Sequence, residues 1–140
     1  MLEPGMPPHV TTFWPFLRRL RDKDKAALDE IAAACSPFDF LLTTIDRFPD
    51  VTFLRPEPAE PFVRLTTLVW QRWPEHAPYG GAFADIVPHL TLAHEPTATA
   101  RGSIEPLLPI AARAQELVVM RRGPDGWHTL YRTALSANSR

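Results

Sequence analysis

The sequence predicts an α+β domain built on antiparallel sheets, and two observations lead to this expectation. Strand-like and helix-like stretches follow one another without the regular alternation that parallel α/β folds require. In addition, the turn signal Gly123-Pro124-Asp125-Gly126 joins two strand-like stretches directly, as in an antiparallel hairpin. A chain of 140 residues suffices for a core without metals or disulfides, but not for two domains. We therefore expect residues 1–140 to form a single domain.

Runs rich in aromatic and β-branched residues predict the strands, because such side chains fit the pleated surface of a sheet. The predicted strands cover residues 9–16, 38–48, 51–55, 89–92, 110–120 and 127–135. Residues 98–108 give only a short, weak helical signal.

Apolar residues at helical spacing predict two longer helices. The first covers residues 22–35, and Asp22 is expected to cap its start. The second covers residues 61–73, where Trp70 and Trp73 are expected to belong to the core because aromatic side chains at helical spacing usually pack there. The apolar stripe of the first helix comprises Leu28, Ile31, Ala32 and Cys35.

Composition excludes several classes of protein. The formal net charge is -1, so no overall field of one sign would hold long nucleic acid, and a nucleic-acid ligand should be small or bound at its end. Cys35 is the single cysteine, which excludes an internal disulfide and a cysteine-based zinc cluster. No apolar run approaches the ~20 residues of a membrane span, and the start lacks the pattern of a signal peptide. We expect a cytoplasmic protein without membrane contacts.

One short motif occurs twice, as Pro8-His9-Val10-Thr11-Thr12 and as Pro88-His89-Leu90-Thr91-Leu92. Successive side chains of a strand point to opposite faces, so the histidine and threonine of each copy would project together while the residue between them enters the core. Two copies of one such arrangement indicate one shared function.

These motifs, at residues 9–12 and 89–92, resemble the paired His-x-Thr motifs of the 2H phosphoesterase superfamily, and specifically its bacterial 2′-5′ RNA ligase-like branch. The segments PHVTTFWPF, FPDVTFLRPEPAEPF and YGGAFADIVPHLTLAH are similar to that branch as well. The resemblance implies two lobes of antiparallel sheet with flanking helices, related by a pseudo-twofold axis, with one motif from each lobe in a central cleft. Members usually have a strand before the first motif, and we expect this first strand to be missing here.

The resemblance implies a metal-independent cyclic phosphodiesterase that opens a 2′,3′-cyclic phosphate on an RNA 3′ end or a small nucleotide. Such a reaction needs a base that takes a proton from water and an acid that protonates the leaving oxygen. His9 and His89 can fill both roles, because imidazole populates both protonation states near neutral pH. Thr11 and Thr91 can donate hydrogen bonds to the phosphate oxygens. No cofactor is expected, and the symmetry of the motifs leaves open which histidine is the base.

Two aromatic side chains are candidates for stacking on a nucleobase. Tyr79 stands in the glycine-containing loop before the second motif, and Phe13 would share the face of its strand with Thr11. His94 stands where many relatives carry an arginine, and strict alternation puts it on the face opposite His89.

Two alternatives stay open at this point. A module that binds a nucleotide or RNA end without turning it over would account for the missing strand, for Thr12 in place of an apolar residue and for His94 in place of arginine. A metal site built from His9, His89 and His94 would use all three histidines, but it leaves the paired threonines unexplained.

Overall fold

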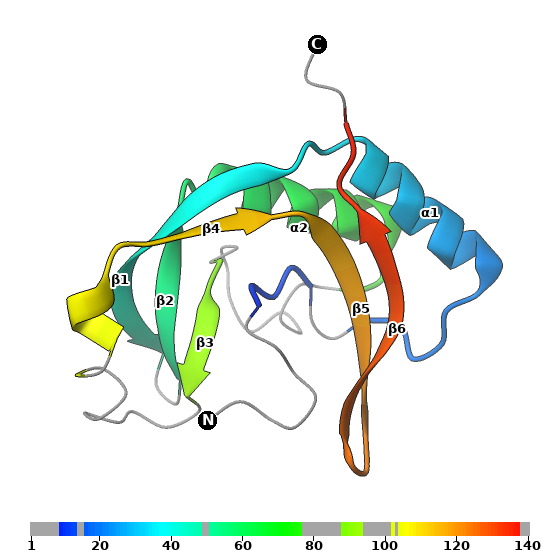
Figure 1. Cartoon of the computed structure of the whole chain (residues 1–140). Helices are drawn as coiled ribbons and strands as arrows, with labels where there is room; N and C mark the ends of the chain where they lie inside the picture. The colour runs from blue at the N-terminus through cyan, green and yellow to red at the C-terminus, as the bar shows by residue number, and fades with distance from the viewer. Residues whose placement is uncertain are drawn as a thin grey trace.

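The computed structural model describes residues 9–13, 16–48, 51–76, 88–93, 102 and 104–137. Within these residues it confirms an α+β fold with antiparallel pairing throughout its two sheets (Figure 1). The elements in chain order are α1 (Asp22–Ala33), β1 (Phe38–Phe48), β2 (Val51–Glu57), α2 (Glu60–Arg72), β3 (Leu90–Ala93), a 3-10 helix (Glu105–Leu107), β4 (Ile110–Ala114), β5 (Glu116–Gly123) and β6 (Gly126–Ala134).

The larger sheet has the strand order β3-β2-β1-β4, and one of its faces packs on α2. The ring of Phe62 on α2 makes edge-to-face contacts with Phe38 and Phe40 of β1, at centroid distances of 4.9 and 5.0 Å. Leu54 of β2, which is 2% exposed, pairs with Leu90 of β3. Directly opposed residues point to the same face of a sheet.

The single strand predicted over residues 110–120 is two strands that belong to different sheets. β4 pairs with β1 in the larger sheet, whereas β5 pairs with β6 in a separate two-stranded sheet. Only Gln115 separates them, and the ribbon runs from one sheet into the other (Figure 1). The prediction was wrong on this point because the pattern of apolar residues reports an extended backbone and carries no information about its partner strand.

The main core lies between α1, α2 and the β5-β6 hairpin. Its buried members are Ala27, Leu28, Ile31, Ala32, Cys35, Leu65, Val69, Trp73 and Leu135. Trp73 is 3% exposed, as predicted, but Trp70 is 42% exposed, so the prediction for Trp70 was wrong. At 100° per residue Trp70 lies roughly 80° around the helix from Phe62, at the margin of the buried stripe.

The start of α1 differs from the prediction, which named Asp22 as the cap. Arg21 is the N-cap residue, and the acidic side chain that completes the capping box is Asp24. The Arg21 backbone N–H donates to Asp24 Oδ2 at 3.0 Å, and this hydrogen bond is the main reason why the pKa of the Asp24 carboxyl is lowered. Asp24 is 1% exposed, so the ionised carboxylate is a buried anchor for the chain entering α1.

Residues 135–137 follow β6 and attach to the end of α1. Leu135 N–H donates to the Gln115 carbonyl at 2.9 Å, Ser136 N–H to that of Ala32 at 3.1 Å, and Ala137 N–H to that of Cys35 at 3.2 Å. The hydroxyl of Ser36 donates back to the Ala137 carbonyl at 2.9 Å. The last described residues therefore connect α1 to the junction between the two sheets. In the described part of the chain, no helix has the length and apolar character needed to cross a membrane.

Candidate functional site

The two copies of the motif lie side by side, although they are far apart in the sequence. Val10 of the first copy forms an antiparallel bridge with Leu90 of the second. The second copy continues into β3, but the first does not form the strand predicted over residues 9–16. Among the described residues of that range the bridge at Val10 is the one strand contact, and the chain bends at Thr12.

The direction of the bridge decides which side chains are neighbours. With Val10 opposite Leu90 in an antiparallel pair, His9 lies on the side of Thr91 and Thr11 lies on the side of His89. Val10 and Leu90 share the face of Leu54, towards α2, so the residues that flank them project from the opposite face. His9, Thr11, His89 and Thr91 are all partly exposed. Each histidine is therefore next to the threonine of the other motif. Because all four side chains are partly exposed, a ligand could contact them.

The imidazole of His89 packs against a buried aromatic ring of the larger sheet. Phe53, in β2, is 1% exposed, and its ring meets that of His89 edge to face with centroids 5.4 Å apart. Phe53 also pairs with Thr91 across the β2-β3 ladder, so one residue contacts both candidate side chains of the second motif. Such a contact restricts the orientation of the imidazole.

A positive charge also lies close to the Phe53 ring. The guanidinium of Arg55, two residues along β2 and on the same face, is 5.7 Å from the Phe53 ring centroid. Arg55 also forms an ion pair with Asp46 of β1 at 2.8 Å. The sequence reasoning did not identify Phe53 or Arg55. The available signal was their separation by one residue in a predicted strand, which places both side chains on one face.

The first motif is fastened to α2 by a side-chain hydrogen bond. The hydroxyl of Thr66, which is 2% exposed, donates to the backbone carbonyl of Thr12 at 2.6 Å. Together with the bridge at Val10, this bond positions a segment that has no continuous strand partner among the described residues.

The remaining predicted site residues are placed differently or not described. Phe13 packs against the main core and meets Phe16 edge to face at 5.9 Å, because the bend at Thr12 ends the alternation that would have put it beside Thr11. Its role in base stacking stays a prediction that this packing does not favour. Tyr79 and His94 lie outside the described residues.

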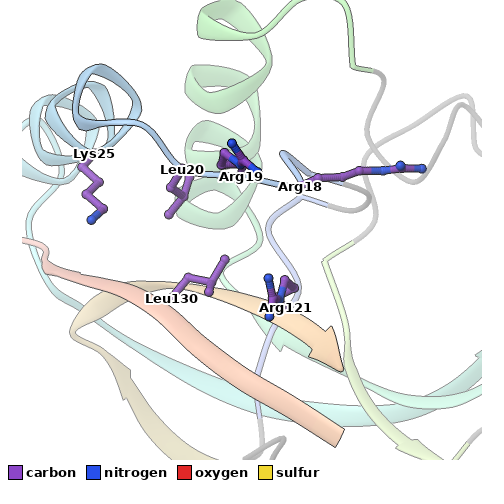
Figure 2. Close-up of a pocket in the computed structure, with 6 residues that line it drawn as sticks. All are labelled: Arg18, Arg19, Leu20, Lys25, Arg121 and Leu130. Atoms are coloured by element: carbon purple, nitrogen blue, oxygen red, sulfur yellow. The ribbon is translucent and has the colours of Figure 1, made fainter. Parts of the chain in front are cut away.

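A basic pocket of about 230 Å³ lies between the chain leading into α1 and the β5-β6 hairpin, and the sequence reasoning missed it. Four of its lining residues are cationic and two are leucines: Arg18, Arg19, Leu20, Lys25, Arg121 and Leu130. Figure 2 shows these side chains on the two sides of the pocket, with Leu20 and Leu130 pointing towards one another. The adjacent arginine pairs in FLRRL and VVMRRG were the available signal.

In the ranges that the structure describes, no group of three or more His, Cys, Asp or Glu side chains is arranged to hold a metal ion. Because His94 is outside those ranges, the metal site proposed from His9, His89 and His94 is not tested.

Solved structures similar to this one share the same fold. TT0787 of Thermus thermophilus is 22% identical with a TM-score of 0.64, and the match covers 93% of this chain and 79% of that one. LigT of E. coli complexed with 3′-AMP is 18% identical with a TM-score of 0.53, covering 91% and 76% of the two chains. LigT complexed with NADP⁺ is 19% identical with a TM-score of 0.55, covering 92% and 76%.

A search of curated protein sequences gives no match. The model of the 2′-5′ RNA ligase superfamily, in contrast, matches residues 3–126, which include both His-x-Thr motifs and most of the chain. The resemblance inferred from the motifs is confirmed: this chain belongs to the 2′-5′ RNA ligase superfamily.

Proposed function

We propose that this protein is a metal-independent phosphodiesterase that opens 2′,3′-cyclic phosphates by general acid and base catalysis with His9 and His89. The observation that carries the proposal is the antiparallel bridge between Val10 and Leu90, which makes neighbours of the two motifs. Membership of the superfamily supports the same reaction class.

The arrangement suits in-line hydrolysis. A phosphate held between the motifs would have one histidine on the side of the attacking water and the other on the side of the leaving 2′ or 3′ oxygen. One neutral imidazole accepts the proton of the water, and one imidazolium protonates the leaving alkoxide, so the pair returns to its starting total of protons after each turnover. Each such group typically contributes about 10²- to 10⁴-fold to the rate.

The threonines complete the proposed site. Because each threonine lies beside the histidine of the other motif, the hydroxyls of Thr11 and Thr91 can donate to both non-bridging oxygens of the same phosphate. Donors that are already in position when negative charge shifts onto those oxygens stabilise the transition state without reorganisation.

The substrate class follows from the chemistry and from the relatives. Opening a 2′,3′-cyclic phosphate with water needs one base and one acid, which two histidines can supply. The complexes of E. coli LigT with 3′-AMP and with NADP⁺ support a nucleotide as the ligand of the corresponding site in this chain. We therefore propose an RNA 3′ end or a small cyclic nucleotide as substrate.

The test is hydrolysis of a 2′,3′-cyclic-phosphate dinucleotide in EDTA by the parent protein and by the variants His9→Ala and His89→Ala. We expect both variants to lose at least about 10²-fold in kcat while keeping the melting temperature of the parent. His128→Ala is the matched control, because His128 lies in the β5-β6 hairpin and interacts with Asp125 at 2.7 Å. Full activity in either motif variant would refute the proposed roles.

The same experiment separates the alternatives. A folded parent protein that binds the dinucleotide but leaves it intact would favour the binding module. Loss of activity in EDTA and recovery on adding zinc would favour the metal site built on His9, His89 and His94. If EDTA does not change the rate, and both His9→Ala and His89→Ala lose activity, the result favours the two-histidine mechanism.

A further inference from the structure

The basic pocket is separate from the motif pair and is not used by the proposed reaction. Its cationic residues come from three places in the chain: Arg18 and Arg19 before α1, Lys25 in the first turns of α1, and Arg121 in β5. The whole chain has a net charge of -1, so this concentration of positive charge is local.

The charges in the pocket are not compensated by the described part of the protein. No acidic side chain lines the pocket, and within the described segments no acidic side chain pairs with Arg18, Arg19 or Arg121. Asp24 forms an ion pair with Arg21, and Asp29 accepts a hydrogen bond from Tyr131 at 2.7 Å, so neither carboxylate is an ion-pair partner of an arginine of the pocket. Lys25 lies over the Tyr131 ring, with its ammonium 5.6 Å from the ring centroid. Four cationic side chains around one pocket, with no acidic side chain among its lining residues, give a positive local potential that favours the binding of an anion.

The size and shape of the pocket favour a phosphate group over a whole nucleotide. Its volume of about 230 Å³ is below the ~300 to 1,000 Å³ of sites that enclose drug-sized ligands. Guanidinium groups donate in a planar fork that matches phosphate oxygens, and the three arginines are exposed to solvent. Leu20 and Leu130 face one another and give the site an apolar wall against which a sugar can pack (Figure 2).

An RNA strand whose 3′ end is bound at the two motifs is long enough to reach the basic pocket. Arg18 follows Thr11 by seven positions, so their Cα atoms are at most about 25 Å apart. A stacked strand that rises about 3.4 Å per nucleotide covers this distance in roughly seven nucleotides.

We propose that the basic pocket is a second phosphate site, which binds a backbone phosphate of the RNA strand whose cyclic end reacts at His9 and His89. The inference rests on the proposed function and deepens it, because it selects an oligonucleotide end over a mononucleotide as the preferred substrate. The pocket raises affinity for the strand and takes no part in the proton transfers.

The test measures binding, so that it does not depend on turnover. A 5′-labelled RNA decamer with a 3′-phosphate, which the protein cannot hydrolyse, is titrated by fluorescence anisotropy at several salt concentrations. We expect Arg121→Gln to weaken binding of the decamer about tenfold at low salt. We also expect the slope of log affinity against log salt to fall by about 0.7, the value for one phosphate contact on a single strand.

Arg122→Gln is the matched control. It removes the same charge from the next residue of β5, whose side chain projects from the other face, and Arg122 does not line the pocket. This variant should keep the affinity and the salt slope within about twofold of the parent. Arg19→Gln tests the opposite side of the pocket, so a folding defect in Arg121→Gln does not decide the result.

Three outcomes would overturn the inference. Equal losses in Arg121→Gln and Arg122→Gln would mean that general charge, not the pocket, binds the strand. An equal loss for 3′-AMP and for the decamer in Arg121→Gln would place the pocket in the reacting site itself. Unchanged decamer binding, with inorganic phosphate altering 3′-AMP binding only when Arg121 is intact, would mean that the pocket takes a separate phosphate ligand.

Failure of the proposed phosphodiesterase function would give different results from failure of the second phosphate site. If the parent protein does not hydrolyse a cyclic-phosphate decamer but binds the 3′-phosphate decamer through Arg121, the phosphodiesterase assignment fails and the second phosphate site stands. If hydrolysis depends on His9 and His89 but Arg121→Gln and Arg19→Gln bind the decamer as the parent does, the phosphodiesterase assignment stands and the second phosphate site is refuted.

Discussion

Replacing Thr66 with valine tests whether the contact between α2 and the first motif supports the function. Valine has the same shape, but it removes the hydroxyl that donates to the Thr12 carbonyl at 2.6 Å. Because Thr66 is 2% exposed and the bond is partly buried, water replaces this donor poorly, and the loss costs about 1–3 kcal/mol. For a chain of 140 residues this corresponds to a melting temperature lower by about 3–10 °C.

The same substitution should lower activity, because Thr12 directly follows Thr11. Freed from α2, the motif holds His9 and Thr11 less well, and displacements of about 1 Å can reduce rates by up to about 10²-fold. We expect kcat on a cyclic-phosphate dinucleotide to fall at least about fivefold in Thr66→Val, measured well below the melting temperature.

Thr67→Val provides the matched control on the same helix. The hydroxyl of Thr67 donates to the Val63 carbonyl at 2.8 Å, within α2 itself, so its loss leaves the first motif untouched. The control should melt within about 2 °C of the parent and retain its kcat. If the two variants melt together and turn over at the same rate, the bond to Thr12 does not position the motif.

Further expectations concern the reacting groups and the start of α1. Phe53→Leu should lower kcat about tenfold with little change in KM, because it removes the ring that orients His89; an unchanged kcat contradicts this. The plot of kcat/KM against pH should be bell-shaped, since one imidazole must be neutral and one protonated, and a single rising limb counts against the assignment. The lowered pKa of Asp24 means that its stabilising effect is complete above the ordinary value of 3.8 and is lost as pH falls through the lower pKa of the folded state. Thermal melts should therefore show Asp24→Asn about 3–6 °C below the control Asp22→Asn at pH 7, and the gap should narrow as pH falls below 3.8.

The sequence predicted the elements whose structure depends mainly on the residues within the segment itself. The strand predicted over residues 38–48 has the same bounds as β1, because its aromatic and β-branched residues fit a sheet whatever their partner. The helices were found within two residues of their ends, but α1 has a different cap, since Asp24 and not Asp22 reaches the free backbone N–H of Arg21.

Features that depend on distant parts of the chain were not predictable in the same way. The chain bends at Thr12, whose carbonyl accepts a hydrogen bond from Thr66, 54 positions away. The residue types of positions 9–16 do not indicate this bend. The division of residues 110–120 at Gln115 depends on which strands pair with each half. Similarly, the motif residues could be found because each copy is contiguous, whereas the pocket joins Arg18 and Arg121 across about 100 positions.

The attachment of residues 135–137 to the end of α1 has a consequence for how the chain folds during synthesis. Hydrogen bonds such as that from Ser136 to Ala32 close a loop of about 100 residues, and contacts of such long range form late because the entropy of closing the loop must be overcome first. While the polypeptide emerges from the ribosome, α1 has neither the β5-β6 hairpin nor these terminal donors to pack against. Nascent chains that stop before Gln115 should therefore stay exposed to proteases and chaperones, and this part of the protein should acquire protection in one late step, once β6 and residues 135–137 have been synthesised.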